Sequence, residues 1–520
     1  MTMTETVQQD VWASASPARV RFTQRERRGV FMGRTGAQLV VSGSALAGIL
    51  FLAITAGYDR AAAFIFMLVG VIVVGIWMHR GIPVITLIAQ SISYLLRAMQ
   101  GQTKFQRSVW WRITTKPIPT GTTGELIPIP EVVKHETLPG GLGDIAYVNI
   151  PSRGGFVLNK REQLVSASVR VISSAWPLRD EGVKEQIYHK FAGWLSSTES
   201  LAGLHEVTMR VRVDRAAATE LADYVASRDE VRETTISEEV QREYATLIAQ
   251  EANRSMEFTN TITLSFDLAE LSSAIRRSGG GLLGISAVIA DQVELLKQSL
   301  DDLYVKFDAW LDAEELEGMT STGLDPISAA RRREHLGTSK RELRTRPPVM
   351  DGQEHRDRIE FDESVHQTLW IHEWPRTAVS TGFLQKLLYA GDSTRCLTIQ
   401  FKPVPLDVAL KELNNAQIDM NTADRVRETW GARTGIHHEQ ERNNLLEREK
   451  DLSDGFTDER FRGFLTISGE SVSALDRDRS ALEQAGFGCG VRMSVLYNQQ
   501  WASLVTSVLP IPTRSGRRKK

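Results

Sequence analysis

Two long apolar runs lie next to each other near the start of the chain. They cover residues 37–58 and 61–78, and only Asp59 and Arg60 separate them. At 1.5 Å per residue the runs would reach roughly 33 Å and 27 Å as helices, close to the roughly 30 Å hydrocarbon core of a bilayer. Neither run has the polar face that a helix on the surface of a globular domain shows. The pattern therefore predicts a two-span transmembrane hairpin over residues 37–78.

Basic and aromatic residues flank the predicted hairpin. Those expected at the membrane boundary are Arg25, Arg27, Arg28, Arg34, Trp77 and Arg80. Because cytoplasmic flanks of membrane spans carry an excess of Arg and Lys, both termini and the soluble bulk are expected in the cytoplasm, with the protein in the cell (inner or plasma) membrane. The apolar but interrupted stretch at 82–99 predicts an amphipathic helix at the inner membrane face.

Beyond residue 116 strand and helix patterns alternate. Residues 206–213 place Val207 and Val211 on one side and Arg210 and Arg212 on the other, which predicts a half-buried strand. Residues 181–197 predict a helix. The strand–helix–strand units favour an α+β fold class, a transmembrane helical hairpin followed by cytoplasmic ferredoxin-like α+β domains.

These patterns predict seven parts, one of which is a highly charged stretch with hardly an apolar residue, interpreted as a solvated linker. The parts are an Arg-rich arm (1–36), the transmembrane hairpin (37–78), the interfacial helix (79–116), a first cytoplasmic α+β domain (117–312), the charged linker (313–362), a second cytoplasmic α+β domain (363–512) and a basic tail (513–520).

Composition narrows the function classes. A formal net charge of −2 over 520 residues argues against a protein that binds nucleic acid through bulk charge. The two cysteines, Cys396 and Cys489, lie far apart in apolar contexts, so we expect buried free thiols and neither a disulfide nor a metal site.

The sequence offers little catalytic chemistry. A phosphate-binding P-loop needs Lys followed by Ser or Thr, and no lysine of this chain is followed by either residue. Gly279, Gly281 and Gly284 fit the G-x-G-x-x-G pattern, but the segment before them predicts a helix, where a dinucleotide site requires a strand. His372 and Glu373 end a predicted strand and are interpreted as part of a structural turn. We therefore expect no catalytic residues, no cofactor, no metal and no enzyme activity.

Several segments resemble components of type IV secretion systems. Residues 22–41 (FTQRERRGVFMGRTGAQLVV), together with the hairpin, resemble the PrgI-like membrane proteins of these systems. Four later segments resemble the non-catalytic amino-terminal region of the conjugation ATPase family, namely HQTLWIHEWPR (366–376), RCLTIQFKPVPLDVALKELNNAQ (395–417), ERFRGFLTISG (459–469) and VLYNQQWASLVTSVLPIP (495–512). The chain is thus similar to actinobacterial conjugation-type membrane proteins that combine both parts. It departs from the family at Leu504, where an aromatic residue is usual.

The resemblance implies a non-enzymatic inner-membrane platform that docks a separate P-loop ATPase, because the chain stops where the family's motor domain would begin. It also implies a homo-oligomer or a multi-protein complex, contact with the lipid bilayer, and no direct nucleic-acid binding. The residues implied for partner docking are Trp374, Arg376, Gln499, Gln500, Leu509, Pro510, Arg517 and Arg518. Two alternatives stay open: a membrane-anchored enzyme of unknown substrate, and a membrane scaffold unrelated to secretion.

Overall fold

The structure is a computed structural model, and it describes most of the chain beyond residue 81. The described residues are 82–106, 130–138, 143–173, 180–215, 256–303, 305–336, 351–375, 382–429, 436–453 and 459–514, with positions 19–20, 45, 47, 78–79, 237, 239–240, 242–243, 246–247 and 379–380. The chain divides into two compact units. The first unit comprises Met1–Arg21, Gln102–Val404 and Thr457–Lys520, and the second comprises Phe22–Gly101 and Pro405–Phe456.

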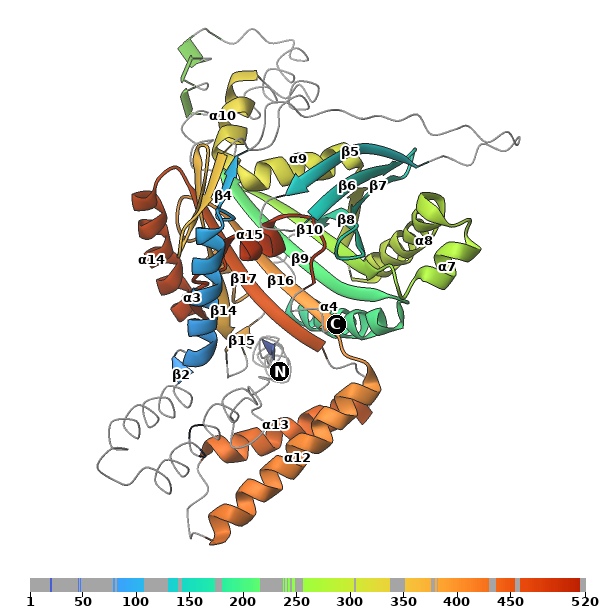
Figure 1. Cartoon of the computed structure of the whole chain (residues 1–520), viewed down its shortest axis with the longest axis vertical. Coiled ribbons are helices and arrows are strands. Elements are labelled where there is room, and N and C mark those ends of the chain that lie inside the picture. Colours follow the sequence, from blue (N-terminus) through green and yellow to red (C-terminus); the bar gives the residue numbers. More distant parts are fainter. Residues whose placement is uncertain are drawn as a thin grey trace, which may run out of the picture. The chain divides into compact units, whose positions relative to one another are not determined.

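A 14-stranded antiparallel sheet forms the first unit (Figure 1). In spatial order its strands are β4 (Lys104–Gln106), β12 (Asp351–Glu354), β13 (Ile359–Phe361), β14 (Ser364–Glu373), β17 (Glu459–Gly469), β16 (Thr394–Pro403), β9 (Leu204–Arg215), β10 (Met256–Asp267), β8 (Leu164–Ser173), β7 (Gly154–Asn159), β6 (Gly143–Ile150) and β5 (Glu131–Leu138). Two further strands pair outside this order: β11 (Val305–Trp310) with β8, and β18 (Arg492–Val495) with β14.

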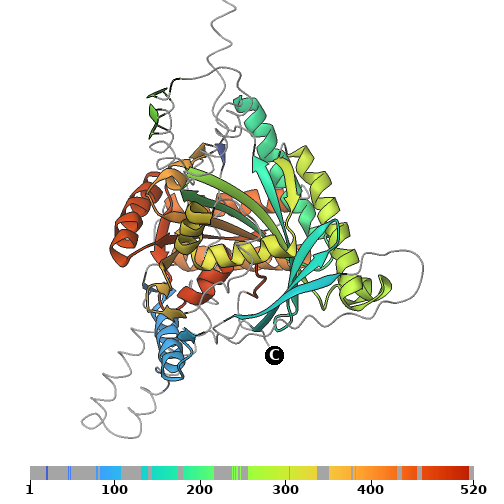
Figure 2. The same ribbon diagram turned by 90° about the horizontal axis from the view of Figure 1, so that it is seen from above.

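One face of the sheet packs against α8 (Gly281–Asp302), whose Ile289 and Leu300 are buried among apolar residues of β6 to β10. The helix α4 (Glu181–Ser197) lies beside α8 (Figure 2), and the indole nitrogen of Trp194 donates a 2.9 Å hydrogen bond to Ser299. The short α7 (Ser272–Arg277) precedes α8, and η2 (Thr198–Ser200) follows α4. The apolar side chains of the alternating strands point to this face, where α8 buries them.

The opposite face carries a second core. It is covered by α15 (Gln500–Val508) and α9 (Ala313–Leu324), and α10 (Pro326–Leu336) packs against α9 and β14. A capping box starts α9. The carboxylate of Asp312 accepts a hydrogen bond from the backbone N–H of Glu315, and the carboxylate of Glu315 accepts one from the backbone N–H of Asp312. Near β14, β17 and β18 lie α11 (Gln385–Tyr389) and α14 (Val472–Gly488), and the two-residue strands β1 (Arg19–Val20) and β15 (Val379–Ser380) pair with each other.

The second unit is described mainly by helices. The helices α12 (Leu406–Thr429) and α13 (Ile436–Ser453) pack together, with a 2.9 Å hydrogen bond from Gln417 to Glu449. The unit also contains α3 (Val84–Met99) and the short strands β2 (Met78–His79) and β3 (Ile82–Pro83). The helix predicted over 82–99 is confirmed by α3.

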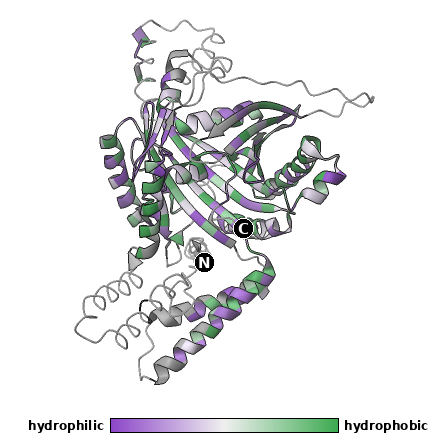
Figure 3. Ribbon diagram, viewed as in Figure 1, coloured by the Kyte–Doolittle hydropathy of each residue, from purple (hydrophilic) through white to green (hydrophobic). Residues whose placement is uncertain are grey.

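The membrane part of the predicted fold class is contradicted. Among the residues that the structure describes, none of the helices combines the length and apolar character that crossing a bilayer requires. The 16 residues of α3 fall short of the roughly 20 needed. The longer α12 carries charged residues in both halves, and Figure 3 shows hydrophilic residues (purple) alternating with hydrophobic ones (green) along it. This finding overturns the predicted transmembrane hairpin and the predicted location in the cell membrane. The predicted interfacial position of residues 79–116 is not tested by it and stays a prediction. Apart from 45, 47 and 78, residues 37–78 lie outside the described residues.

The α+β character is shown, but the sheet is organised differently from two ferredoxin-like domains. The strand β9 pairs with β16 over seven residues, from Val213 opposite Arg395 to Val207 opposite Phe401. This pairing joins strands from both predicted domains into one sheet. The predicted linker at 313–362 contains α9, α10, β12 and β13, and Leu316 and Leu324 of α9 are buried in the second core.

Candidate docking site around the 500–514 segment

A row of buried polar side chains crosses the middle of the sheet on the face that carries α15. Thr368 is directly opposite Thr466, and Thr398 is directly opposite Arg210. The other neighbours in the row are offset by two positions, which keeps all of these side chains on the same face. The row comprises Thr368 of β14, Thr466 of β17, Thr398 of β16, Arg210 of β9, Thr263 of β10, Ser166 of β8 and Asn159 of β7, and all are buried. Residues 500–514, here called the 500–514 segment, lie over this row and satisfy most of its hydrogen bonds.

Arg210 is the centre of the row. Its Nε donates to the Ser507 carbonyl oxygen at 3.0 Å, its Nη1 to the Thr263 hydroxyl at 2.8 Å, and its Nη2 to the Leu509 carbonyl oxygen at 2.8 Å. These carbonyls lie at the carboxyl end of α15, where backbone acceptors lack helical partners and a cation is favoured. Burial lowers the pKa of Arg210 to about 10, so the side chain stays charged at neutral pH. Arg210 thus caps α15 from the sheet.

Smaller side chains bind the residues that follow the helix. The hydroxyl of Ser166 donates to the Pro510 carbonyl oxygen at 2.8 Å, and Asn159 Nδ2 donates to the Pro512 carbonyl oxygen at 3.0 Å. On the other side of Arg210, the Thr398 hydroxyl donates to Ser507 at 2.5 Å. All these bonds use backbone acceptors of the 500–514 segment. The sheet therefore binds the backbone of the segment, and these hydrogen bonds do not depend on the identity of the segment's side chains.

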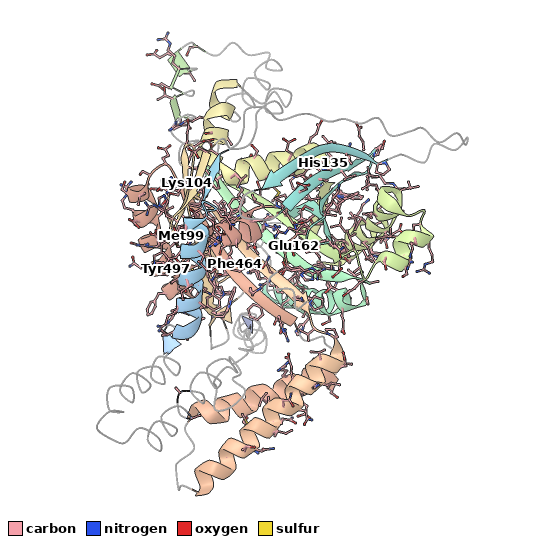
Figure 4. All side chains as sticks on the ribbon, viewed as in Figure 1. Met99, Lys104, His135, Glu162, Phe464 and Tyr497 are labelled. Atoms are coloured by element: carbon pink, nitrogen blue, oxygen red, sulfur yellow. The ribbon has the colours of Figure 1, made fainter. Side chains whose placement is uncertain are left out.

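Both ends of the segment are also fixed. At its start, the Gln500 side chain accepts from the Thr368 backbone N–H at 2.8 Å and donates to its carbonyl oxygen at 3.3 Å. At its end, Arg514 donates to the carbonyl oxygen of Glu162 at 3.0 Å and forms an ion pair with Asp267 at 2.5 Å; Glu162 is labelled in Figure 4. The segment is anchored from β14 to the turn between β7 and β8.

The structure brings together only part of the predicted docking set. Gln500, Leu509 and Pro510 belong to the 500–514 segment and are buried against the sheet, while Gln499 is half-buried and precedes α15. Trp374 is also buried, with its ring 5.4 Å from that of Phe461. A docking role for these residues stays a prediction.

The remaining predicted residues lie outside the part that the structure describes. They are the docking residues Arg376, Arg517 and Arg518 and the membrane-flanking residues Arg25, Arg27, Arg28, Arg34, Trp77 and Arg80.

The glycine pattern at 279–284 has a packing explanation. The helix predicted before it is α7, and Gly279 to Gly281 all have positive φ, a conformation that glycine adopts at little cost. A Cβ on Gly284 would lie 2.2 Å from the Ile275 carbonyl oxygen, so this glycine allows α7 and α8 to approach closely. At the other candidate, Glu373 faces Arg492 at 3.4 Å. Within the described ranges, no group of three or more acidic, His or Cys side chains is arranged to hold a metal.

Comparisons with known proteins add no relative. No protein-family model matches the sequence, and no curated protein matches it. The fold and the site alone define the class: an α+β protein with a broad antiparallel sheet whose polar face holds a later segment of the same chain by its carbonyl groups.

Proposed function

We propose that this chain is a non-enzymatic platform component of a type IV secretion or conjugation-type system, and that it docks a separate P-loop ATPase. The proposal rests on the positions, in the fold, of the four later segments that resemble the conjugation ATPase family. Three of them supply β14, β16 and β17, which are adjacent in the sheet, and the fourth supplies α15. Since α15 packs on these three strands, the parts of the resembling segments that belong to the first unit form one packed body, which supports a shared origin.

A platform role agrees with the chemistry of the residues. The chain has no Lys-Ser or Lys-Thr pair with which to bind the β- and γ-phosphates of a nucleotide. Its G-x-G-x-x-G pattern allows the close contact between α7 and α8. We infer that nucleotide hydrolysis is supplied by the partner, and that this chain works with further copies of itself or with other components of the machine.

The test is retention of a purified conjugation-type P-loop ATPase, chosen as the one encoded beside this chain's gene. We expect the two proteins to co-elute in size-exclusion chromatography, whereas an unrelated hexameric P-loop ATPase should elute separately. The chain alone should not hydrolyse ATP. Failure of the neighbouring ATPase to bind contradicts the docking role, and ATP turnover that remains after contaminating ATPases are removed contradicts the non-enzymatic role.

A further inference from the structure

The helix α3 exposes a stripe of large apolar side chains along one side. Its other side holds half-buried residues such as Leu87 and Tyr94. The side chains of the stripe are between 44% and 84% exposed, and they are Ile88, Ile92, Leu95, Leu96 and Met99. Figure 4 labels Met99, which ends the helix. Single exposed apolar residues are common, but several on one face of a 16-residue helix form a patch, and such a patch marks an interaction surface.

The spacing within the stripe is that of a contact between two helices. Intervals of four, three and four residues separate Ile88, Ile92, Leu95 and Met99. Alternation of three and four is the heptad pattern, in which the a and d residues of one helix pack against a second helix. In that frame Ile92 is an a residue and Leu95 is a d residue, a combination typical of two-stranded pairs. The stripe therefore predicts another helix as its partner.

The positions beside the stripe carry no charge. In the same heptad frame the e and g positions are Ala89, Ser91, Leu96 and Ala98. Charges at e and g positions select the partner of such a helix, and like charges there hold identical helices apart. The single charged side chain of α3 is Arg97, which is half-buried with its guanidinium 5.9 Å from the centre of the Tyr94 ring. Two copies of α3 can therefore meet without charge repulsion.

The polar side of α3 is poorly suited to a lipid surface. Helices that lie on a membrane are rich in Lys and Arg on the polar face, which attract anionic lipid headgroups. Here that face offers Arg97 alone. A protein helix therefore fits the stripe better than a bilayer does.

We propose that α3 is a self-association surface, and that its stripe packs against α3 of a second copy of this chain. The absence of charge at the e and g positions selects this occupant, since an uncharged heptad stripe is complementary to an identical one. The inference goes beyond the proposed function, because it rests on α3 alone and holds whether or not an ATPase docks.

The size of the stripe sets the strength of the contact. A helix of 16 residues is about 24 Å long and about 10 Å wide, so one side of it offers about 240 Å² per copy. Two copies then bury about 500 Å², which is below the roughly 1,200 Å² of a stable specific complex. We therefore expect a weak self-association that depends on the concentration of the chain.

The experiment measures the mass of the purified full chain by sedimentation equilibrium over a series of concentrations. The mass should rise with concentration, and Ile92→Glu should weaken self-association about tenfold, equivalent to about 1.4 kcal/mol. The matched control is Ile418→Glu in α12, since Ile418 is 54% exposed and Ile92 is 53% exposed. The control should leave the association constant within about twofold. Because both positions are exposed, dilute samples of both variants should keep the melting temperature of the unchanged chain.

A mass of one chain at every concentration, or equal weakening by the two variants, would overturn the inference. Binding of a monomeric chain to vesicles of anionic phospholipid through Ile92 would also contradict it, because lipid would then be the occupant. A lower melting temperature of dilute Ile92→Glu, with self-association unchanged, would show that the stripe is covered within the chain itself. No ATPase enters this assay, so its failure leaves the proposed function standing.

Discussion

The guanidinium of Arg210 donates a 2.8 Å hydrogen bond to the carbonyl oxygen of Leu509, which lies 299 residues further along the chain. It holds the 500–514 segment over the polar face of β9, which is therefore buried in the interior of the protein. It also makes the first unit depend on a cation that is almost completely buried, with 3% of its surface exposed.

Replacement of Arg210 by Met should therefore destabilise the protein strongly. The variant would leave the buried Leu509 carbonyl without its side-chain donor and the Ser507 carbonyl with the Thr398 hydroxyl in place of two donors. We expect a loss of about 3–5 kcal/mol in the free energy of unfolding, measured by urea denaturation. Arg170→Met is the control, since its ion pair with Asp308 is 40% exposed on the arginine side and should contribute less than about 1 kcal/mol. Equal losses in the two variants would show that the interior bonds of Arg210 carry no special weight.

His366 should make stability depend on pH. The side chain is fully buried between the Ser468 hydroxyl and the Leu324 carbonyl oxygen, and burial lowers its pKa from 6.5 to about 4. Between these values the unfolded chain binds the proton more readily, so stability is lost as the pH falls from 6.5 to about 4. We expect this residue to account for about 3 kcal/mol of that loss. In His366→Asn the dependence should be shallower by that amount, and parallel curves for the two proteins would contradict the prediction.

Gly155 and Gly318 should respond in opposite ways to substitution by Ala. A Cβ on Gly155 would lie 2.6 Å from the backbone nitrogen of Ala313 and 2.9 Å from the Val148 carbonyl oxygen, neither of which can move away easily. We expect a loss of about 1–3 kcal/mol. Gly318 lies within α9 in open space, so an alanine there should stabilise by up to about 1 kcal/mol. Thermal denaturation tests both predictions: the melting temperature should fall in Gly155→Ala and rise in Gly318→Ala.

Cys396 should react with thiol reagents only when the sheet opens. It is 4% exposed, its Sγ is 3.8 Å from the Ser507 carbonyl oxygen, and burial raises the pKa of its thiol. In a Cys489→Ser background, labelling should be slow and should accelerate with urea. A cysteine introduced at the exposed Ala502, in a background without other cysteines, should label at the rate of a free thiol. Rapid labelling of Cys396 in the folded protein would contradict the burial of this site.

Local patterns predicted individual elements well. The helix expected at 181–197 is α4, and the strand expected at 206–213 lies within β9. The pairing of β9 with β16 was not predictable in this way, since the partners lie far apart in sequence and no local pattern specifies a long-range neighbour. The charged stretch at 313–362 contains few apolar residues, and this composition alone predicts a linker. The pair Asp312 and Glu315 was the available signal, since it forms the capping box of α9.

The candidate site was missed for a related reason. Strict alternation in β9 assigned Arg210 to a solvent-facing side, because one apolar face is normally enough to explain such a strand. The structure buries both faces, since α15 covers the polar one. Small hydroxyl residues at alternate positions of neighbouring strands, such as Ser166 with Ser168 and Thr261 with Thr263, were the signal of burial on both sides. Of the predicted docking residues, the sequence could group Gln500, Leu509 and Pro510, but not the row that holds them.

The position of the 500–514 segment sets an order of events during synthesis. Every strand of the sheet emerges from the ribosome before α15 does, yet Ser166 and Asn159 find their acceptors only 344 and 353 residues later. Until then the polar row must stay hydrated or be held by another protein. Contacts of such long sequence separation slow folding, because the chain must close large loops before they form. The nascent protein therefore passes through a stage in which the polar face of the sheet is exposed to water, and chaperones can bind it at that stage.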